Sequence, residues 1–297
     1  MTNSPALAYG IAPPSFRLPG ATRLGRVRLQ VADLARSIAY YETVIGLRVI
    51  DREGSVATLG PHGSDNVVVE LHERSGAKRV TRRGQIGLYH FAILLPDRAA
   101  LGRFVRHLAE LGEYAGMSDH FVSEAVYLQD PDGLGIEVYA DRPREAWRTE
   151  NNQLAMTTLP LDVQNLTAEA GDEPWTGAPA GTVLGHVHLY VRDLADASAF
   201  YHEGLGFDKV VWSYPGALFM SAGGYHHHLG TNTWAAGAPL AADDEARLLE
   251  WEIVVPDEAS AFAAGKNLEA KGFLVERDAG DVVARDAWGT QVRVRPA

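Results

Sequence analysis

Any transition-metal site in this chain has to use histidine and carboxylate ligands, because its 297 residues include 11 His and no Cys. His90, Glu137 and His186 each lie in a segment whose apolar residues alternate as they do in a strand. Two neutral imidazoles and one carboxylate on one side of a metal leave its other positions open. This arrangement suits Fe(II) or Mn(II) that must bind a substrate and oxygen together. A lone histidine on an apolar strand is more often a hydrogen-bonded core residue, so only the three together indicate a metal centre.

Three consecutive histidines, His226 to His228, form a second candidate feature. Neighbouring residues on a strand point to opposite faces, so either His227 alone or His226 with His228 would face one cavity. A histidine in such a cavity can move protons near neutral pH. The alternative is that all three lie at the surface or the edge of the core, after a bulge at the two preceding glycines. His188 would share a face with His186, either beside the metal site or in a packing role.

The chain that must position these residues is a duplication. Val27 to Val49 resembles Val187 to Lys209 at an offset of about 160 residues, and the segment 88–97 matches 248–257 at the same offset. Two segments that match in the same order indicate that residues 21–141 and 183–297 are related halves. Residues 142–182 between them lack sustained periodicity and are rich in polar, Gly and Pro residues, which is typical of a linker.

Each half divides again into two modules with the order strand, helix and three strands. In the first module an alternating strand is followed by Asp33, a helical spacing of apolar residues, and Gly46 as the helix end. Alternating stretches broken by glycines then indicate three further strands. The same pattern recurs, so we expect an α+β protein of four βαβββ modules, at about 24–77, 87–141, 184–238 and 248–296.

With these modules, the stretch HFVSEAVYLQDPDGLGIEVY from His120 to Tyr139 resembles the vicinal oxygen chelate superfamily of glyoxalases, bleomycin resistance proteins and extradiol dioxygenases. The closest resemblance is to the catechol 2,3-dioxygenase type. That type has a His, a Val-Ser pair, a Tyr, an Asp-Pro-Asp-Gly turn and a Glu ligand, matched here by His120, Ser123, Tyr127, the turn 130–133 and Glu137. The resemblance implies two open, barrel-like cavities for metal or ligand.

The resemblance also implies roles for individual residues. The metal would be Fe(II), with Mn(II) as the alternative, held by His90, His186 and Glu137. The substrates would be a small aromatic diol and O2. His227, favoured over His228 by its register, would be the acid/base residue. His120 and Tyr127 would donate hydrogen bonds to substrate oxygens. The implied activity is opening of the ring beside the two hydroxyl groups.

One departure from the family concerns the distribution of the ligands. The family places them in modules three and four, whereas here they fall in modules two and three. Arg26, Glu250 and Arg293 stand at the corresponding positions of modules one and four. We therefore expect modules two and three to pair around the metal, and the other two to be closed by an ion-pair group. The alternative is pairing within each half, with two incomplete sites.

Two other functions on this fold stay open at this point. A glyoxalase-like isomerase or lyase would use extra carboxylates, for which Glu70 and Glu250 are available. A metal-free protein of the bleomycin-resistance type would sequester a small molecule instead.

Composition argues against other partners. Lys and Arg number 27 against 38 Asp and Glu, a net charge of −11, which disfavours nucleic acid and anionic membranes. No stretch approaches the roughly 18 apolar residues of a membrane helix, and the first residues do not resemble a signal peptide. A cytoplasmic location is therefore expected, and exposed sheet edges favour a homo-oligomer.

Overall fold

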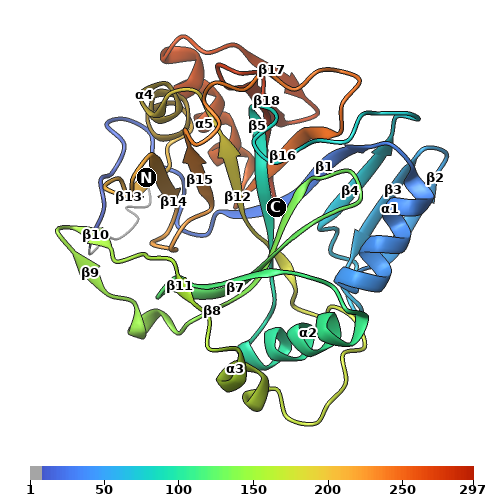
Figure 1. Cartoon of the computed structure of the whole chain (residues 1–297). Coiled ribbons are helices and arrows are strands. Elements are labelled where there is room, and N and C mark those ends of the chain that lie inside the picture. The colour runs from blue at the N-terminus through green and yellow to red at the C-terminus, as the bar shows by residue number, and fades with distance from the viewer. Residues whose placement is uncertain (1–8) are drawn as a thin grey trace.

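Two mixed sheets form the fold of the computed structural model, which describes residues 9–297 (Figure 1). The first sheet has eight strands in the order β17-β18-β19-β16-β1-β4-β3-β2. Its strands are β1 (Arg23–Val31), β2 (Arg48–Glu53), β3 (Val56–Gly60), β4 (Val69–Glu73), β16 (Arg247–Val255), β17 (Val275–Asp278), β18 (Asp281–Arg285) and β19 (Gln291–Pro296).

The second sheet has nine strands in the order β11-β6-β7-β8-β5-β12-β15-β14-β13. Its strands are β5 (Gly87–Leu94), β6 (Gly116–Asp119), β7 (Ser123–Gln129), β8 (Gly135–Asp141), β11 (Leu159–Pro160), β12 (Val183–Tyr190), β13 (Asp208–Val211), β14 (Ala217–Ser221) and β15 (Leu229–Asn232).

The modules pair across the two halves of the chain. β5 of module two and β12 of module three run antiparallel side by side through the middle of the molecule, and β1 of module one pairs with β16 of module four (Figure 1). The expected α+β architecture of four βαβββ modules, with modules two and three joined in one sheet, is therefore confirmed. Pairing within each half does not occur, because each sheet takes strands from both halves.

The helices begin and end where the sequence indicates. The Asp33 side chain accepts a hydrogen bond from the Arg36 N–H at 2.9 Å and caps α1 (Leu34–Tyr40), which continues as a π-turn, η1 (Tyr41–Ile45). Gly46 then takes a positive φ of 80°. Asp97 caps α2 (Arg98–Leu111) and Asp257 caps α5 (Glu258–Ala270) in the same way. In module three the helix is short, α4 (Leu194–Ala197) followed by the π-turn η3 (Ser198–Gly204).

The segment between the halves carries short elements: η2 (Arg144–Ala146), β9 (Thr149–Glu150), β10 (Gln153–Leu154), β11 and α3 (Val163–Glu169). β11 extends the nine-stranded sheet beyond β6. α3 lies so close to α2 that a Cβ at Gly102 would come within 2.6 Å of the Leu166 carbonyl oxygen. This segment therefore packs against module two.

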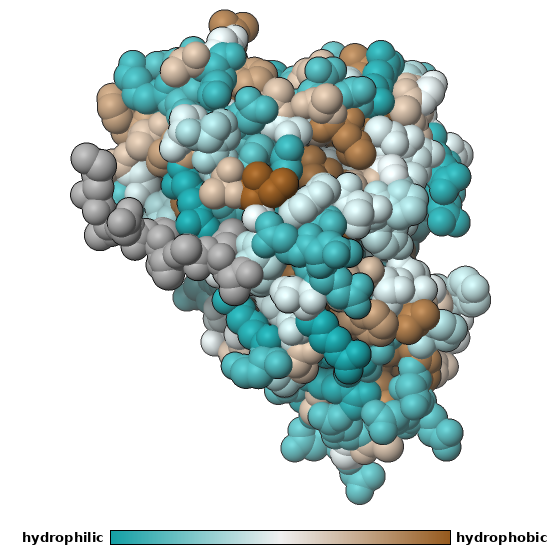
Figure 2. Space-filling view, turned by 90° about the vertical axis from the view of Figure 1, so that its left-hand side faces the viewer, coloured by the Kyte–Doolittle hydropathy of each residue, from teal (hydrophilic) through white to brown (hydrophobic). Residues whose placement is uncertain are grey.

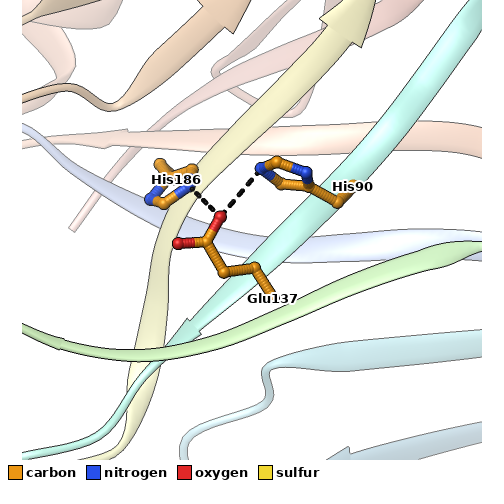
Figure 3. A group of neighbouring side chains, drawn as sticks. All are labelled: His90, Glu137 and His186. Carbon is orange, nitrogen blue, oxygen red and sulfur yellow. Dashed lines mark hydrogen bonds and ion pairs between the residues drawn. The ribbon is translucent and has the colours of Figure 1, made fainter. Parts of the chain in front are cut away.

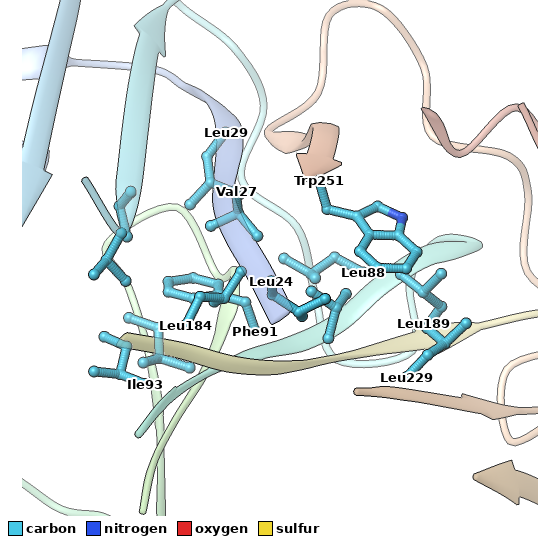
Figure 4. Close-up of a cluster of buried hydrophobic side chains, with 14 of the residues drawn as sticks. Leu24, Val27, Leu29, Leu88, Phe91, Ile93, Leu184, Leu189, Leu229 and Trp251 are labelled. Atoms are coloured by element: carbon cyan, nitrogen blue, oxygen red, sulfur yellow. The ribbon is translucent and has the colours of Figure 1, made fainter. Parts of the chain in front are cut away.

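The hydrophobic core lies where the joining strands of the two sheets pack against each other, β1 on β12 and β16 on β5. Val27, Phe91, Leu189 and Trp251 are fully buried there (Figure 4). Replacing a buried aromatic residue such as Trp251 by Ala typically costs about 3–5 kcal/mol. The core therefore holds the four modules, and the strands that carry the candidate ligands, in fixed relative positions.

The outside of the molecule is mixed in character. Figure 2 shows one face, on which hydrophilic and hydrophobic residues are interspersed. Among the described residues, no helix combines the length and the apolar character needed to cross a membrane.

Candidate metal centre

Three adjacent strands, β8, β5 and β12, place Glu137, His90 and His186 together. Ala92 on β5 pairs with Glu137 on one side and with His186 on the other. His90 lies two residues before Ala92 and therefore shares its face of the sheet. Because alanine has a small side chain, the space above it is left to the three larger residues.

The three side chains converge through their polar atoms (Figure 3). The Nε2 atoms of His90 and His186 lie 3.0 and 3.1 Å from the Glu137 Oε2 atom, and the three ligand atoms lie within 4.8 Å of one another. Two atoms bound at right angles to one ion about 2.1 Å away would be about 3.0 Å apart. All three residues are buried, and they form the one cluster of this kind in residues 9–297.

The hydrogen bonding of the imidazoles fits a metal ligand set. Both nitrogens of His90 and the Nδ1 of His186 are buried and form no hydrogen bond; the His90 Nε2 atom has only its 3.0 Å ion-pair contact with Glu137 Oε2. Buried polar atoms in this state are uncommon in folded proteins. A cation bound between His90, His186 and Glu137 would provide the missing partner for the His90 Nε2 atom, so these residues fit a divalent metal.

Electrostatics keeps Glu137 and His186 in the protonation states that bind metal. Burial lowers the pKa of His186 to about 4, although Glu137 acts in the opposite direction. Burial raises the pKa of Glu137, but the neighbouring His186 and His90 outweigh it and hold that pKa well below the usual value. Near neutral pH, Glu137 is therefore an anion and His186 is neutral, which are the forms that bind metal.

Behind the cluster, Tyr139 packs against His186 with ring centroids 4.9 Å apart. Its hydroxyl lies 2.6 Å from that of Tyr225, which in turn lies 3.2 Å from the Asp141 Oδ1 atom. Position 185 has to be glycine for this contact, because a Cβ there would lie 1.8 Å from the Tyr139 hydroxyl. Gly185 therefore lets the aromatic ring support His186, a candidate metal ligand.

The three consecutive histidines do not lie on a strand, contrary to expectation. Gly223 and Gly224 turn the chain with positive φ angles of 63° and 68°, and β15 begins only at Leu229. His227 nevertheless lines the cavity, and its ring centroid lies 4.0 Å from that of His186. His228 faces elsewhere, since its Nδ1 atom accepts a hydrogen bond from the Ala222 N–H.

His226 connects His227 to a carboxylate that sequence reasoning missed. The His226 Nε2 atom lies 2.9 Å from Asp141 Oδ1, and its Nδ1 atom lies 2.7 Å from His227 Nδ1. A carboxylate only accepts, so His226 donates from Nε2 and, when neutral, accepts at Nδ1 from His227. The remaining Nε2 atom of His227 then carries a free lone pair. Burial and the nearby His186 hold the pKa of His227 well below its usual value, which favours this neutral form.

His120 and Tyr127 both line the cavity, but they bond to each other. The His120 Nδ1 atom donates to the Thr157 carbonyl oxygen at 2.5 Å, so its Nε2 atom accepts the hydrogen bond of the Tyr127 hydroxyl at 2.6 Å. With His120 neutral, the Tyr127 hydrogen is held by His120, and donation by both residues to substrate oxygens stays a prediction. A second proton on His120 would release the Tyr127 hydrogen.

The cavity that these residues share has a volume of about 700 Å³. His188, whose role was left open, lines it and accepts a hydrogen bond at Nε2 from the Asn232 side-chain amide at 3.0 Å. Sequence reasoning missed most of the walls, which come from loops and edge strands far apart in the chain. The aromatic residues that line the cavity and were not predicted are Tyr89, Tyr114, Tyr190, Tyr214, Phe219 and Trp234.

The eight-stranded sheet carries ion pairs at the positions that correspond to the candidate metal ligands of the nine-stranded sheet. Arg293 donates from Nε to Glu250 at 2.9 Å, as expected, whereas Arg26 pairs with Glu252 at 3.0 Å and with Glu70 at 3.1 Å. Neither Glu70 nor Glu250 lines the cavity with the metal cluster. The extra carboxylates considered for an isomerase therefore lie in the other sheet.

Comparisons with known proteins agree with this geometry. A family model described as the glyoxalase/bleomycin resistance protein/dioxygenase superfamily matches residues 23–138 and 183–290. A curated protein of Bacillus subtilis (strain 168), named catechol-2,3-dioxygenase, is 44% identical over 259 residues, which are 86% of this chain and 90% of the relative.

Two solved structures share the fold at low sequence identity. A protein of Bacillus subtilis subsp. subtilis str. 168 superimposes with a TM-score of 0.64 at 13% identity, over 95% of this chain and 86% of that one. Glyoxalase I from Zea mays superimposes with a TM-score of 0.56 at 19% identity, over 92% of each chain.

Proposed function

Because the chain belongs to the glyoxalase/bleomycin resistance protein/dioxygenase superfamily, we propose that it is an extradiol dioxygenase that opens the ring of a catechol beside its two hydroxyl groups. The observation that carries this proposal is the buried cluster of His90, Glu137 and His186 at the wall of a cavity of about 700 Å³. The name of the 44% identical relative points to the same activity. The proposed metal is Fe(II), with Mn(II) as the alternative that the same ligands accept.

The cluster would hold the metal through two imidazole nitrogens and one carboxylate oxygen, and the remaining positions would be open to the substrates. The chemistry that the bound ion supplies is the activation of O2 with electrons drawn from the diol ring. Both oxygen atoms end in the ring-opened product. The protein's part is to bind the diol, to exclude water and to move its hydroxyl protons.

His227 is the proposed acceptor of a hydroxyl proton from the bound diol. Its Nδ1 atom is held by His226, so the free lone pair on Nε2 is available to a ligand in the cavity. Removal of the proton strengthens the diol as a metal ligand and as an electron donor. The same nitrogen can later return the proton to the product.

Tyr127 and His120 are the proposed partners of a substrate oxygen. The Tyr127 hydroxyl lies at the cavity wall, and its hydrogen is held by His120 Nε2. When His120 gains a proton there, the Tyr127 hydrogen turns toward the cavity and can stabilise negative charge on a substrate oxygen. Aromatic side chains around the site exclude water and match the flat face of a diol ring.

The experiment is anaerobic loading of the purified chain with Fe(II), followed by addition of catechol and O2. We expect one iron per chain, O2 uptake and a yellow ring-opened product. Glu137→Gln should lose iron and activity together, whereas His227→Gln should keep the iron and slow turnover about 10²–10⁴-fold. Glu42→Gln, a change of an exposed carboxylate on η1, is the matched control and should behave as the wild type.

The other outcomes distinguish the alternatives. Iron bound at one per chain without O2 uptake on any catechol would contradict the proposal and favour an isomerase or lyase. No metal binding at all would favour a sequestering protein of the bleomycin-resistance type.

A further inference from the structure

The loop that precedes β5 brings two cations to the proposed active site. Arg82 and Arg83 both line the cavity and are exposed at its mouth. They are the only Lys or Arg residues among the lining residues of the described chain, and Glu137 is the only carboxylate there. The cavity therefore has a negative ligand cluster at one end and a pair of positive charges at its entrance.

The carboxylates near this loop already have other partners. The segment 239–246 runs beside 78–86, joined by bridges from Lys78 to Glu245 and from Ile86 to Leu240. On that segment, Asp244 pairs with Lys78 at 2.6 Å and Asp243 pairs with Arg247 at 2.7 Å. The Glu245 carboxylate accepts the Ala242 N–H. No ion pair among residues 9–297 engages Arg82 or Arg83, whose guanidinium groups therefore stay available to an anion.

Aromatic rings connect these arginines to the metal centre. Burial raises the pKa of Tyr89 and of Tyr190, and the nearby positive charges of Arg82 and Arg83, respectively, act in the opposite direction. The Tyr89 ring lies 4.8 Å from the Tyr190 ring and 4.6 Å from that of His90, measured between centroids. Tyr89 and His90 are neighbours in the chain, yet both line the cavity, where β5 and β12 are irregularly paired. One wall of the cavity is therefore aromatic from the metal ligands to the arginines.

The size of the cavity exceeds what unsubstituted catechol needs. Pockets of a few hundred to about 1,000 Å³ enclose most of a drug-sized ligand, and catechol has far fewer atoms than such a ligand. A diol ring bound at His90, Glu137 and His186 leaves room along the aromatic wall for a substituent that ends at Arg82 and Arg83.

We propose that Arg82 and Arg83 form an anion-binding subsite, and that the substrate is a catechol whose ring carries a carboxylate on a side chain. Guanidinium groups bind carboxylates through two parallel hydrogen bonds, which gives orientation as well as attraction. The chain as a whole carries a net charge of −11, so a cationic entrance would concentrate an anionic substrate where the rest of the surface repels it. This inference rests on the proposed function.

The test compares a neutral and an anionic diol with side chains of equal carbon number on the Fe(II)-loaded protein. We expect kcat/KM for 3,4-dihydroxyphenylpropionate to exceed that for 4-propylcatechol about tenfold or more, mainly through KM, and the difference to shrink as salt is raised. In the double variant Arg82→Gln, Arg83→Gln the ratio should fall toward one. Arg52→Gln, an exposed arginine on β2, is the matched control and should keep the wild-type ratio.

Two results would overturn the subsite: equal KM values for the two diols in the wild type, or an unchanged preference in the double variant. Failure of the proposed function is separate, because it would appear as no turnover of any diol. In that case the subsite is still tested by titration with the same two diols, followed by the part of the tryptophan fluorescence that is lost in a Trp234→Phe variant. The wild type should bind the carboxylate more tightly and the double variant should not.

Discussion

At the scale of single residues, Asp141 determines which ring nitrogen of His227 carries the hydrogen, and it acts through His226. Asp141 fixes the hydrogen of His226 on Nε2, and His226 then fixes that of His227 on Nδ1. All of these contacts lie on the Nδ1 side of His227 and leave its Nε2 atom to the proposed substrate. The reactive nitrogen is thus set by a carboxylate that would touch neither the metal nor the diol.

Asp141→Asn should lower kcat about 10–100-fold while iron content and KM change little. An asparagine amide can donate to His226 Nε2, which moves each hydrogen along the chain and places one on His227 Nε2, so that the base is blocked. Tyr225→Phe is the control, because it removes a neighbouring hydrogen bond to Asp141 and leaves the two histidines in place. Nitrogen NMR of the histidine side chains reports the tautomers directly. An Asp141→Asn variant with wild-type kcat would disprove the positioning role.

The residues of this site differ in how far the sequence could predict them. His90, Glu137 and His186 could be proposed because their types are few and their strands could be located. The chain from Asp141 to His226 could not, because the two residues are 85 positions apart and meet only when β8 packs near the loop before β15. The hydrogen bond between His120 and Tyr127 could not be predicted either, because it depends on the Thr157 carbonyl oxygen, which orients the His120 ring.

At the scale of elements, the turn between β7 and β8 joins the two sheets. The Asp130 Oδ1 atom accepts hydrogen bonds from the Asp132 and Leu134 N–H groups at 2.9 and 2.8 Å, which shapes the turn. Its other oxygen accepts the Tyr41 hydroxyl at 3.3 Å, from the π-turn of module one. Asp286 and Tyr201 repeat this contact at 2.8 Å in the second half. Part of the Asp-Pro-Asp-Gly motif therefore serves module docking, which in turn positions the strand of Glu137.

Asp130→Asn should make folding stability less dependent on pH. Burial raises the pKa of Asp130 to about 7 from an ordinary value of 3.8, despite the N–H groups that act the other way. The folded state therefore holds a proton that the unfolded state has released, and this stability is lost as pH rises from about 4 to 7. The expected slope is about 1.4 kcal/mol per pH unit for a single group.

Urea unfolding of the wild type and the variant, from pH 5 to 8, measures this difference. The free energy of unfolding of the asparagine variant should rise relative to that of the wild type as pH increases to about 7. Above that pH the difference between the two should stay constant. Tyr41→Phe, which retains the carboxyl group, should keep the pH dependence of the wild type. Parallel curves for the wild type and Asp130→Asn would show that this carboxyl does not titrate in the range.

At the scale of the whole molecule, modules pair across the two halves of the chain. The candidate ligands therefore meet in one site and are not divided between two incomplete ones. His90 and Glu137 come from the first half and His186 from the second, joined by the pairing of β5 with β12. Strand and helix patterns predicted four modules but not their pairing. From those patterns alone, the edges of β1 and β5 could pair equally well with each other or with strands of the second half. What indicated the pairing was the distribution of ligands, together with the arginines and glutamates that now form ion pairs in the other sheet.

Neither half should fold alone, and the metal site should require both. Cutting the chain after Gly171, in an exposed turn, gives residues 1–171 and 172–297. Each fragment exposes the edge strands β1 and β5, or β12 and β16, that are paired in the intact protein, and unpaired apolar edges favour aggregation. We expect separate fragments to show no cooperative unfolding and no tight Fe(II) binding. Co-expressed fragments should assemble into a complex with one iron.

Glu137→Gln in the first fragment or His186→Gln in the second should remove that iron without separating the fragments, because the core around Trp251 and Phe91 still holds the sheets together. This pair of variants distinguishes assembly from metal binding. Tight iron binding by residues 1–171 alone would mean that two ligands suffice. It would contradict a site whose third ligand arrives only when the two halves exchange modules.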